Sequence, residues 1–229
     1  MRLPPPERIA AVAAAVATPF VVVAAAVLLF LNPIWVGFDQ DRSDVAGLTG
    51  YTPSQVRQVT GSILSDLVFG PPTFDVAIDG QAVLDTRSRA HMADVRSVLT
   101  TLGAVALVAA LVLAAIGVAS RGRRWFWRAT EVGASVLAGG VVVVGLAFTV
   151  FFDQAFEVFH RIFFPPGTYT FDPLTEKLVQ LFPDQFWAET SLALAVAVLV
   201  LSLAVRAGAR LLGRATVAAE MPGAPEAGR

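Results

Sequence analysis

Four long apolar runs divide the chain, and polar segments of different lengths separate them. The runs cover residues 9–31, 97–120, 129–152 and 188–211. At 1.5 Å per residue, a run of this length gives about 35 Å of helix, which crosses a hydrocarbon core of about 30 Å with some tilt. The first run is too long for the apolar part of a cleavable signal peptide, which favours an uncleaved anchor. The pattern therefore predicts four transmembrane helices.

The polar segment 32–96 is long enough to fold into a small cap. Residues 52–55 read Thr-Pro-Ser-Gln, which is a capping box with proline at the first helical position. The apolar residues that follow recur at helical spacing, which indicates an amphipathic helix. Asp79-Gly80 stands between two short apolar stretches and is a strong signal for a β-hairpin turn. The segment therefore predicts a short helix plus a β-hairpin.

The polar segment 153–187 is rich in aromatic residues, and a short helix is expected near its end, over residues 174–182. Two interpretations of the aromatic residues are open. They could form an ordinary belt at the membrane interface, or they could wall a pocket for acyl chains and exclude water from it. The residues expected to line such a pocket are Phe152, Phe156, Phe163, Tyr169 and Trp187.

The distribution of arginine predicts how the four helices are oriented. The loop 121–128 holds four arginines and no acidic residue, and three more arginines stand where the fourth run ends. The positive-inside rule then places both termini, this loop and the tail 212–229 in the cytoplasm. The segments 32–96 and 153–187 face outward and carry thirteen acidic and seven basic residues. We expect an all-α membrane protein with four transmembrane helices and a small mixed extracytoplasmic cap.

Composition narrows the class of protein further. Hydrophobic residues make up 55% of the 229 residues and charged residues 15%, which is not typical of a soluble domain. The absence of cysteine excludes disulfides and thiol nucleophiles. The net charge of −1 says nothing about nucleic acid, but no basic cluster lies outside the cytoplasmic helix ends, so we expect no binding to nucleic acid. Seventeen basic residues include a single lysine, which is typical of a GC-rich bacterial genome, so we expect a bacterial cell membrane protein.

The chain has two histidines, His91 and His160, and each stands where an outward-facing segment meets a predicted span. Imidazole takes up and releases protons near neutral pH, so two of them at one membrane depth predict a catalytic site at the lipid–water boundary. Asp94 follows His91 by three residues, a helical spacing that lets a carboxylate orient the ring. The alternative for Asp94 is an ion pair with Arg89 or Arg96.

Other chemistry finds less support in the sequence. His91, His160 and either Asp153 or Glu157 could supply two histidines and one carboxylate to a metal ion. No HxxxH or HExxH spacing is present, however, and no GxSxG motif for a serine nucleophile. We therefore expect no metal and no cofactor.

Four short motifs, in this order and with compatible spacing over nearly the whole chain, resemble the lipoprotein intramolecular transacylase family, also called Lit. This family consists of four-span bacterial membrane proteins. The motifs are His91-Met92-x-Asp94-Val95-Arg96, Phe159-His160-x-x-Phe163-Phe164, Tyr169-x-x-Asp172-Pro173 and Leu181-Phe182-Pro183-x-x-Phe186-Trp187.

The resemblance implies an acyltransferase whose substrates are diacylated bacterial lipoproteins. The reaction moves the sn-2 acyl chain of an S-diacylglyceryl cysteine to the α-amine of that cysteine. His91 and His160 would be the catalytic pair, and either could act as the base; we favour His91, oriented by Asp94. Arg96 would contact the oxyanion or a lipid phosphate, or serve as an interfacial anchor. Asp153 and Asp172, together with Trp187, would position the aromatic segment.

A second hypothesis belongs to a different class of protein. The same scaffold could serve a membrane protein without enzymatic activity, which binds lipid or assists assembly and uses its histidines structurally. Replacing either histidine separates the two hypotheses, since an enzyme would lose activity while it remained folded and inserted in the membrane.

Overall fold

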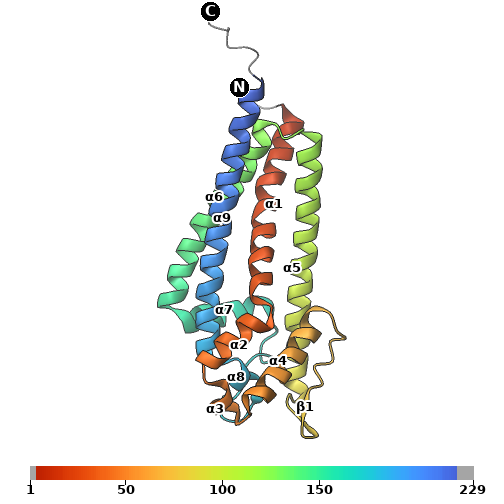
Figure 1. The fold of residues 1–229 in the computed structure, drawn as a ribbon, viewed down its shortest axis with the longest axis vertical. Helices are drawn as coiled ribbons and strands as arrows, with labels where there is room; N and C mark the ends of the chain where they lie inside the picture. Colours follow the sequence, from red (N-terminus) through yellow and green to blue (C-terminus); the bar gives the residue numbers. More distant parts are fainter. Residues whose placement is uncertain (1–3, 221–229) are drawn as a thin grey trace, which may run out of the picture. The chain divides into compact units, whose positions relative to one another are not determined.

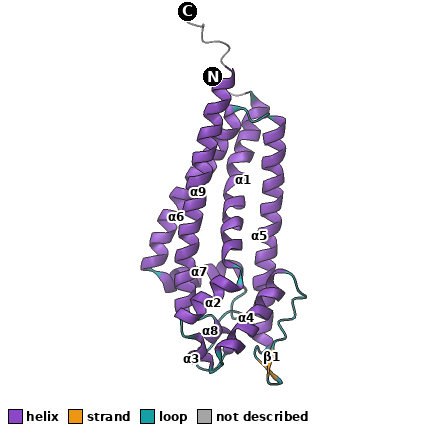
Figure 2. Cartoon of the chain, in the orientation of Figure 1, coloured by secondary structure: helices purple, strands orange, loops and turns teal. Residues whose placement is uncertain are grey.

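Four long helices dominate the computed structural model, which describes residues 4–220. They are α1 (Pro5–Phe30), α5 (Thr86–Ala119), α6 (Arg124–Val150) and α9 (Asp184–Glu220), and Figure 1 follows the chain through them. Each is long and apolar enough to cross a membrane, α9 over Asp184–Thr216. The prediction of four membrane helices is confirmed, and the described residues hold only two short strands besides helices and loops (Figure 2).

The second long helix begins well before the predicted span, because Asp85 caps it. The Ser88 backbone N–H donates to the Asp85 carboxylate at 2.7 Å, as at a helix N-terminus. Together with the Ser88 hydroxyl, this hydrogen bond lowers the pKa of Asp85. The candidate residues near His91 therefore stand on the polar first turns of α5. The membrane boundaries within the long helices stay predictions.

A short helix that the sequence did not predict follows the first long helix directly. α2 (Pro33–Arg42) begins at Asn32, whose side chain accepts hydrogen bonds from the backbone N–H groups of Ile34 and Trp35, each at 3.0 Å. The Asn-Pro pair therefore separates α1 from α2 and also starts α2, since proline fits the first helical position.

The predicted features of the cap are confirmed. The capping box at Thr52 is present at the start of α4 (Pro53–Val68). The hairpin pairs β1 (Ala77–Ile78) with β2 (Gln81–Ala82) in antiparallel register. Asp79 and Gly80 both have positive φ, at 51° and 78°, as a type I′ turn requires. The remaining short helices are α3 (Val45–Thr49), α7 (Phe152–Phe163) and α8 (Lys177–Leu181).

The chain divides into two compact units. The first unit comprises Met1–Ala25, Ala104–Val142 and Ala197–Arg229, within which the described residues begin at 4 and end at 220. Its helices approach closely at Gly133, where a Cβ atom would lie 2.3 Å from the carbonyl oxygen of Ala15. Only glycine lets α1 and α6 pack at this distance.

The second unit comprises Ala26–Gly103 and Val143–Val196, so it holds both histidines and all the short elements. Its hydrophobic core is formed by side chains that are almost completely buried, contributed by α4, the hairpin region and α8. The largest of them are Phe74, Ile63, Leu84 and Leu181. Burying side chains of this size stabilises a cap by about 1.5–3 kcal/mol each.

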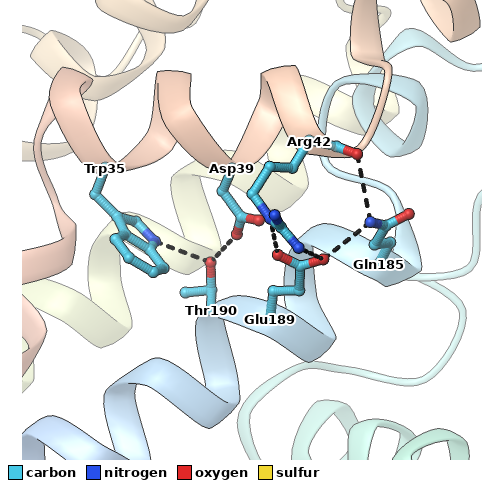
Figure 3. Close-up of polar contacts among 6 residues, drawn as sticks. All are labelled: Trp35, Asp39, Arg42, Gln185, Glu189 and Thr190. Atoms are coloured by element: carbon cyan, nitrogen blue, oxygen red, sulfur yellow. Dashed lines mark hydrogen bonds and ion pairs between the residues drawn. The ribbon is translucent and has the colours of Figure 1, made fainter.

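A polar cluster, which we call the α2–α9 clamp, joins two helices of the second unit (Figure 3). Thr190 donates to the Asp39 carboxylate at 2.6 Å and accepts from the indole N–H of Trp35 at 3.1 Å. The members of the clamp are Trp35, Asp39 and Arg42 of α2 and Gln185, Glu189 and Thr190 of α9.

The outer part of the α2–α9 clamp is an ion pair. The guanidinium of Arg42 donates twice to the carboxylate of Glu189, at 2.6 and 3.2 Å, and Gln185 donates to the same carboxylate at 2.9 Å. The inner part is Asp39, whose side chain is fully buried. Burial raises the pKa of Asp39 above its ordinary value, because the charged form loses hydration.

Candidate functional site

The two histidines, 69 positions apart in the sequence, lie side by side in the second unit. The ring centroids of His91 on α5 and His160 on α7 are 6.1 Å apart, and the ring planes differ by 21°. Both side chains are largely buried, with exposed fractions of 8% and 9%. The structure therefore brings together the two residues that the sequence singled out as a pair.

The orientation of His160 is fixed by its own helix. Its Nδ1 lies 2.8 Å from the carbonyl oxygen of Phe156, one turn earlier on α7. A carbonyl oxygen only accepts hydrogen bonds, so we assign the ring hydrogen of the neutral imidazole to Nδ1. The lone pair is then on Nε2, and this nitrogen can accept a proton.

His91 is held differently, and its predicted orienting residue does not reach it. Among the described residues, its buried Nδ1 has no hydrogen-bond partner. The hydrogen bond that we expected His91 to donate to the Asp94 carboxylate is therefore absent within residues 4–220, and the His91 ring packs against Phe164 and Phe171 instead. The alternative ion pairs of Asp94 are also absent within residues 4–220, since Arg89 pairs with Asp75 at 3.3 Å and Arg96 bonds to backbone.

Aromatic rings surround both imidazoles. Phe156 and Tyr169 lie 4.2 and 5.1 Å from the His160 ring, centroid to centroid. Phe164 touches both histidines, at 4.8 Å from His91 and 5.4 Å from His160. Phe171 lies 5.4 Å from His91. Rings at these distances exclude water from the imidazoles, which strengthens electrostatic interactions at the site.

The five residues predicted to line a pocket divide into three groups. Phe156 and Tyr169 lie against His160. Phe152 and Trp187 contact Phe156, at 5.5 and 6.1 Å, and so stand one ring further from the imidazoles. Phe163 is 47% exposed and packs on Phe159 rather than on a histidine.

Two aromatic residues at the site, Phe164 and Phe171, were not among the predicted ones. Phe164 is buried, and its backbone N–H donates to the carbonyl oxygen of His160 where α7 ends. The guanidinium of Arg87 stands over the Phe171 ring at 4.8 Å. The motif Phe159-His160-x-x-Phe163-Phe164 contains two adjacent phenylalanines, and which of them turns inward depends on where α7 ends.

The residues that we expected to support the histidines, namely Arg96, Asp153 and Asp172, hold helix ends and turns. Arg96 donates to the backbone carbonyl oxygens of Asp66 and Gly70, so it fastens the end of α4 to α5. Asp153 is exposed in the first turn of α7, where a carboxylate stabilises the helix dipole. Asp172 accepts hydrogen bonds from Leu174 N–H and the Thr175 hydroxyl, which holds the turn before α8.

A small network at Glu157, which the sequence analysis missed, positions Tyr169 over His160. The Tyr169 hydroxyl donates to the Glu157 carboxylate at 3.2 Å, and Arg161 pairs with the same carboxylate at 2.8 Å. The guanidinium of Arg161 lowers the pKa of Glu157, and the Tyr169 hydroxyl contributes in the same direction. Glu157 therefore stays ionised as an acceptor.

Within residues 4–220, no group of three or more His, Asp and Glu side chains is arranged to hold a metal ion. The site instead offers two imidazoles enclosed by aromatic rings. Such a pair can take a proton from one reacting group and give a proton to another, which is what an acyl transfer between nitrogen and oxygen requires.

Comparison with known proteins identifies relatives of this arrangement. A family model described as "Lipoprotein intramolecular transacylase Lit" matches residues 12–187. No curated protein sequence shows a significant match to the chain.

Solved structures show the same fold. The chain is similar to the membrane integral lipoprotein intramolecular transacylase Lit from Bacillus cereus, with a TM-score of 0.78 and 17% identity, over 93% of this chain and 98% of that one. A variant of that protein with a histidine-to-arginine mutation gives a TM-score of 0.73 at 17% identity, over 93% and 95%. A histidine-to-alanine variant gives 0.75 at 16%, over 93% and 96%.

Proposed function

Because the chain belongs to the family of lipoprotein intramolecular transacylases and is therefore an acyltransferase, we propose that His91 and His160 carry out its reaction. The observation that carries this proposal is the distance of 6.1 Å between the only two imidazoles of the chain. The non-enzymatic alternative considered from the sequence is set aside by the family.

The reaction turns an ester into an amide within one substrate molecule. The α-amine of the lipidated cysteine attacks the carbonyl carbon of the sn-2 ester, a C–N bond forms, and the bond to the glyceryl oxygen breaks. The nitrogen loses a proton as the C–N bond forms, and the glyceryl oxygen gains one as it leaves. Since both groups belong to the same lipid head, the protein's task is to hold them in reacting geometry.

His160 acts as the base. The Phe156 carbonyl holds its Nδ1 hydrogen, so Nε2 presents a lone pair to the attacking amine. A partner that fixes the tautomer and the ring orientation is what a general base needs. This assignment replaces His91 as the favoured base, since its expected partner Asp94 does not bond to it.

His91 acts on the leaving oxygen. Within the described residues, its Nδ1 makes no hydrogen bond to the protein, so this nitrogen is free to give a proton to the glyceryl oxygen. The proton that His160 takes up passes to the other ring nitrogen of His91, whose ring lies 6.1 Å away, centroid to centroid, so His91 gives its proton from Nδ1 without becoming an imidazolate.

The aromatic rings around the pair protect the reaction from water. Phe156, Phe164 and Tyr169 lie against the imidazoles and offer an apolar surface to the acyl chain. Excluding water matters here, because water at the ester carbonyl would hydrolyse the lipid instead of letting the amine take the acyl chain.

We place this site at the outer face of a bacterial cell membrane. The arginine-rich loop 121–128 supports this orientation through the positive-inside rule, with both termini in the cytoplasm. The segments 32–96 and 153–187 then form the outer cap that carries the two histidines. Diacylated lipoproteins reach the site from the outer leaflet.

That the acyl chain moves within one lipoprotein molecule is tested by mass spectrometry of a reporter lipoprotein. Two preparations of diacylglyceryl reporter, which differ in peptide mass, are mixed, one with deuterated and one with ordinary acyl chains. The chain is then added in unlabelled phospholipid. Fragment ions should place one acyl chain on the cysteine nitrogen, and each peptide should keep its own label. Exchange of labels between peptides, or acyl chains drawn from phospholipid, would overturn intramolecular transfer.

A further inference from the structure

Several arginines line an open groove in the first unit. They have no role in the proposed reaction. The groove has a volume of about 690 Å³ and lies between α6 and α9. Arg124 and Arg128 line it from α6, and Arg210 and Arg214 line it from α9. A smaller groove of about 330 Å³ shares the two α9 arginines and adds Arg206.

Helical spacing puts these arginines on facing stripes. Arg124 and Arg128 are four residues apart on α6, and Arg206, Arg210 and Arg214 are four apart in turn on α9, so each set shares one face. The two helices pack closely at Gly213, where an added Cβ atom would lie 3.2 Å from the Cβ atom of Trp127.

The charge in this region is strongly one-sided. Among the residues that the structure describes, Glu131 is the only acidic side chain that lines either groove, and it pairs with Arg210. Five guanidinium groups and one carboxylate leave a surplus of four positive charges. Like charges four residues apart destabilise a helix, so a bound anion would relieve repulsion along both stripes.

One guanidinium group is also incompletely bonded. Arg206 Nε is buried and, among the described residues, has no hydrogen-bond partner. A buried N–H of a charged group without an acceptor costs more free energy than an ordinary hydrogen bond returns. The position therefore calls for an acceptor, and phosphate oxygens are acceptors that arginine binds in a forked geometry.

Exposed apolar residues flank the arginines, which distinguishes a lipid from a free anion. Leu203 and Leu211 line the smaller groove, and Val132 lines the larger one. Their exposed fractions are 45%, 65% and 52%. Both α6 and α9 are long and apolar enough to cross a membrane. The acyl chains of a lipid whose headgroup lies in the groove would therefore cover these apolar side chains.

We propose that the groove between α6 and α9 binds the headgroup of an anionic phospholipid, with the phosphate among the arginines and the acyl chains against the flanking apolar residues. This site is independent of the histidine pair and of the proposed reaction. The bound phospholipid would belong to the leaflet of the membrane that meets the Arg124 end of α6.

The test is native mass spectrometry of the full chain, purified in detergent and stripped of lipid. Dioleoyl phosphatidylglycerol and dioleoyl phosphatidylcholine are titrated separately, and inorganic phosphate is added as a competitor. Arg128→Gln and Arg214→Gln each remove one positive charge from the groove, and Glu131→Gln removes its acidic residue. Arg123→Gln is the matched control, because Arg123 pairs with Glu7 and does not line the groove.

Phosphatidylglycerol should bind more tightly than phosphatidylcholine, and each arginine variant should weaken its binding about fivefold. Glu131→Gln should strengthen binding, because it frees Arg210, while Arg123→Gln should leave it unchanged. Equal binding of the two lipids, or equal loss in the control, would overturn the proposal. Displacement of the lipid by inorganic phosphate at equal concentration would assign the groove to a free anion instead. The gain expected for Glu131→Gln keeps the test decisive if an arginine variant fails to fold.

Discussion

The α2–α9 clamp and the histidine pair both bury polar side chains within the second unit, and they satisfy them to different degrees. In the clamp, Thr190 bonds to both Asp39 and Trp35, and one oxygen of Asp39 alone is left without a partner within the described residues. In the histidine pair, His160 makes one hydrogen bond to backbone, and His91 Nδ1 makes none within residues 4–220. The clamp therefore bonds its side chains to one another and leaves a single oxygen without a partner, whereas within residues 4–220 neither imidazole is bonded to another side chain.

The α2–α9 clamp and the histidine pair also differ in their contact with water. The ion pair of Arg42 and Glu189 keeps contact with solvent, at 53% and 29% side-chain exposure. The imidazoles are enclosed by phenyl rings, with Phe164 in contact with both. Water that screens the clamp would compete with the amine at the histidines, so the aromatic enclosure has a chemical purpose that the clamp does not share.

The largest expected effect is on acyl transfer when either histidine is replaced. His160→Gln and His91→Gln should each lower the rate of transfer by about 10²–10⁴, because a glutamine cannot move the proton. Their melting temperatures should stay near that of the unaltered chain. Phe163→Leu, at an exposed ring that touches neither histidine, is the control and should keep its activity. A histidine variant that transfers acyl chains at the normal rate would contradict the assignment.

Replacing Arg96 should lower stability, as replacing a clamp residue does, and should not abolish acyl transfer, as replacing a histidine does. Arg96→Met removes two charge-assisted hydrogen bonds, to the carbonyl oxygens of Asp66 and Gly70. We expect it to lower the free energy of unfolding by about 1.5–3 kcal/mol, measured by denaturation in detergent. Arg57→Met, at an exposed position of α4, should change stability little. Loss of transfer in a fully folded Arg96→Met protein would instead give Arg96 a role at the oxyanion.

Thr190→Val breaks the clamp at its centre with little change in side-chain volume. It removes the hydrogen bonds to Asp39 and from Trp35, and leaves the buried carboxylate without its donor. The expected loss in free energy of unfolding is about 1–3 kcal/mol. Transfer should persist below the melting temperature of the variant. An unchanged melting temperature would show that the clamp does not hold α2 to α9.

The smallest expected effect is a pH dependence from Asp39. Its pKa is raised by burial, so the charged form is less favourable in the folded protein than in the unfolded chain, where the pKa is about 3.9. The contribution of Asp39 to stability therefore falls as pH rises through its folded pKa. Asp39→Asn removes this dependence. As pH rises from 4 to 7, the melting temperature of the variant should therefore increase relative to that of the unaltered chain. A constant difference across this range would contradict the raised pKa.

Much of the fold could be predicted because its signals are local. The four apolar runs, the capping box at Thr52 and the Asp79-Gly80 turn each specify structure within a few residues. The helix α7 also had a signal that was missed, since phenylalanines recur at 152, 156, 159 and 163, a helical spacing. The helix α2 is short and carries polar residues on a buried face, so no apolar periodicity marked it.

The site was predictable only in part, because it depends on packing between distant segments. Membrane depth was enough to predict that His91 and His160 meet. It did not predict that Phe164 and Phe171 would take the place beside His91 that Asp94 was expected to fill. That outcome is decided by where α7 ends and how the following loop returns, and neither is encoded in the residues near His91.

The most direct test measures transfer and thermal stability together on His160→Gln and Thr190→Val. Reporter lipoprotein conversion is followed by mass spectrometry at a temperature where both variants are folded. The comparison predicts that His160→Gln abolishes conversion and keeps its melting temperature, while Thr190→Val melts earlier and still converts the reporter. If His160→Gln converted the reporter, or lost activity only as far as it lost folded protein, the histidine pair would be part of the scaffold and not the site of the reaction.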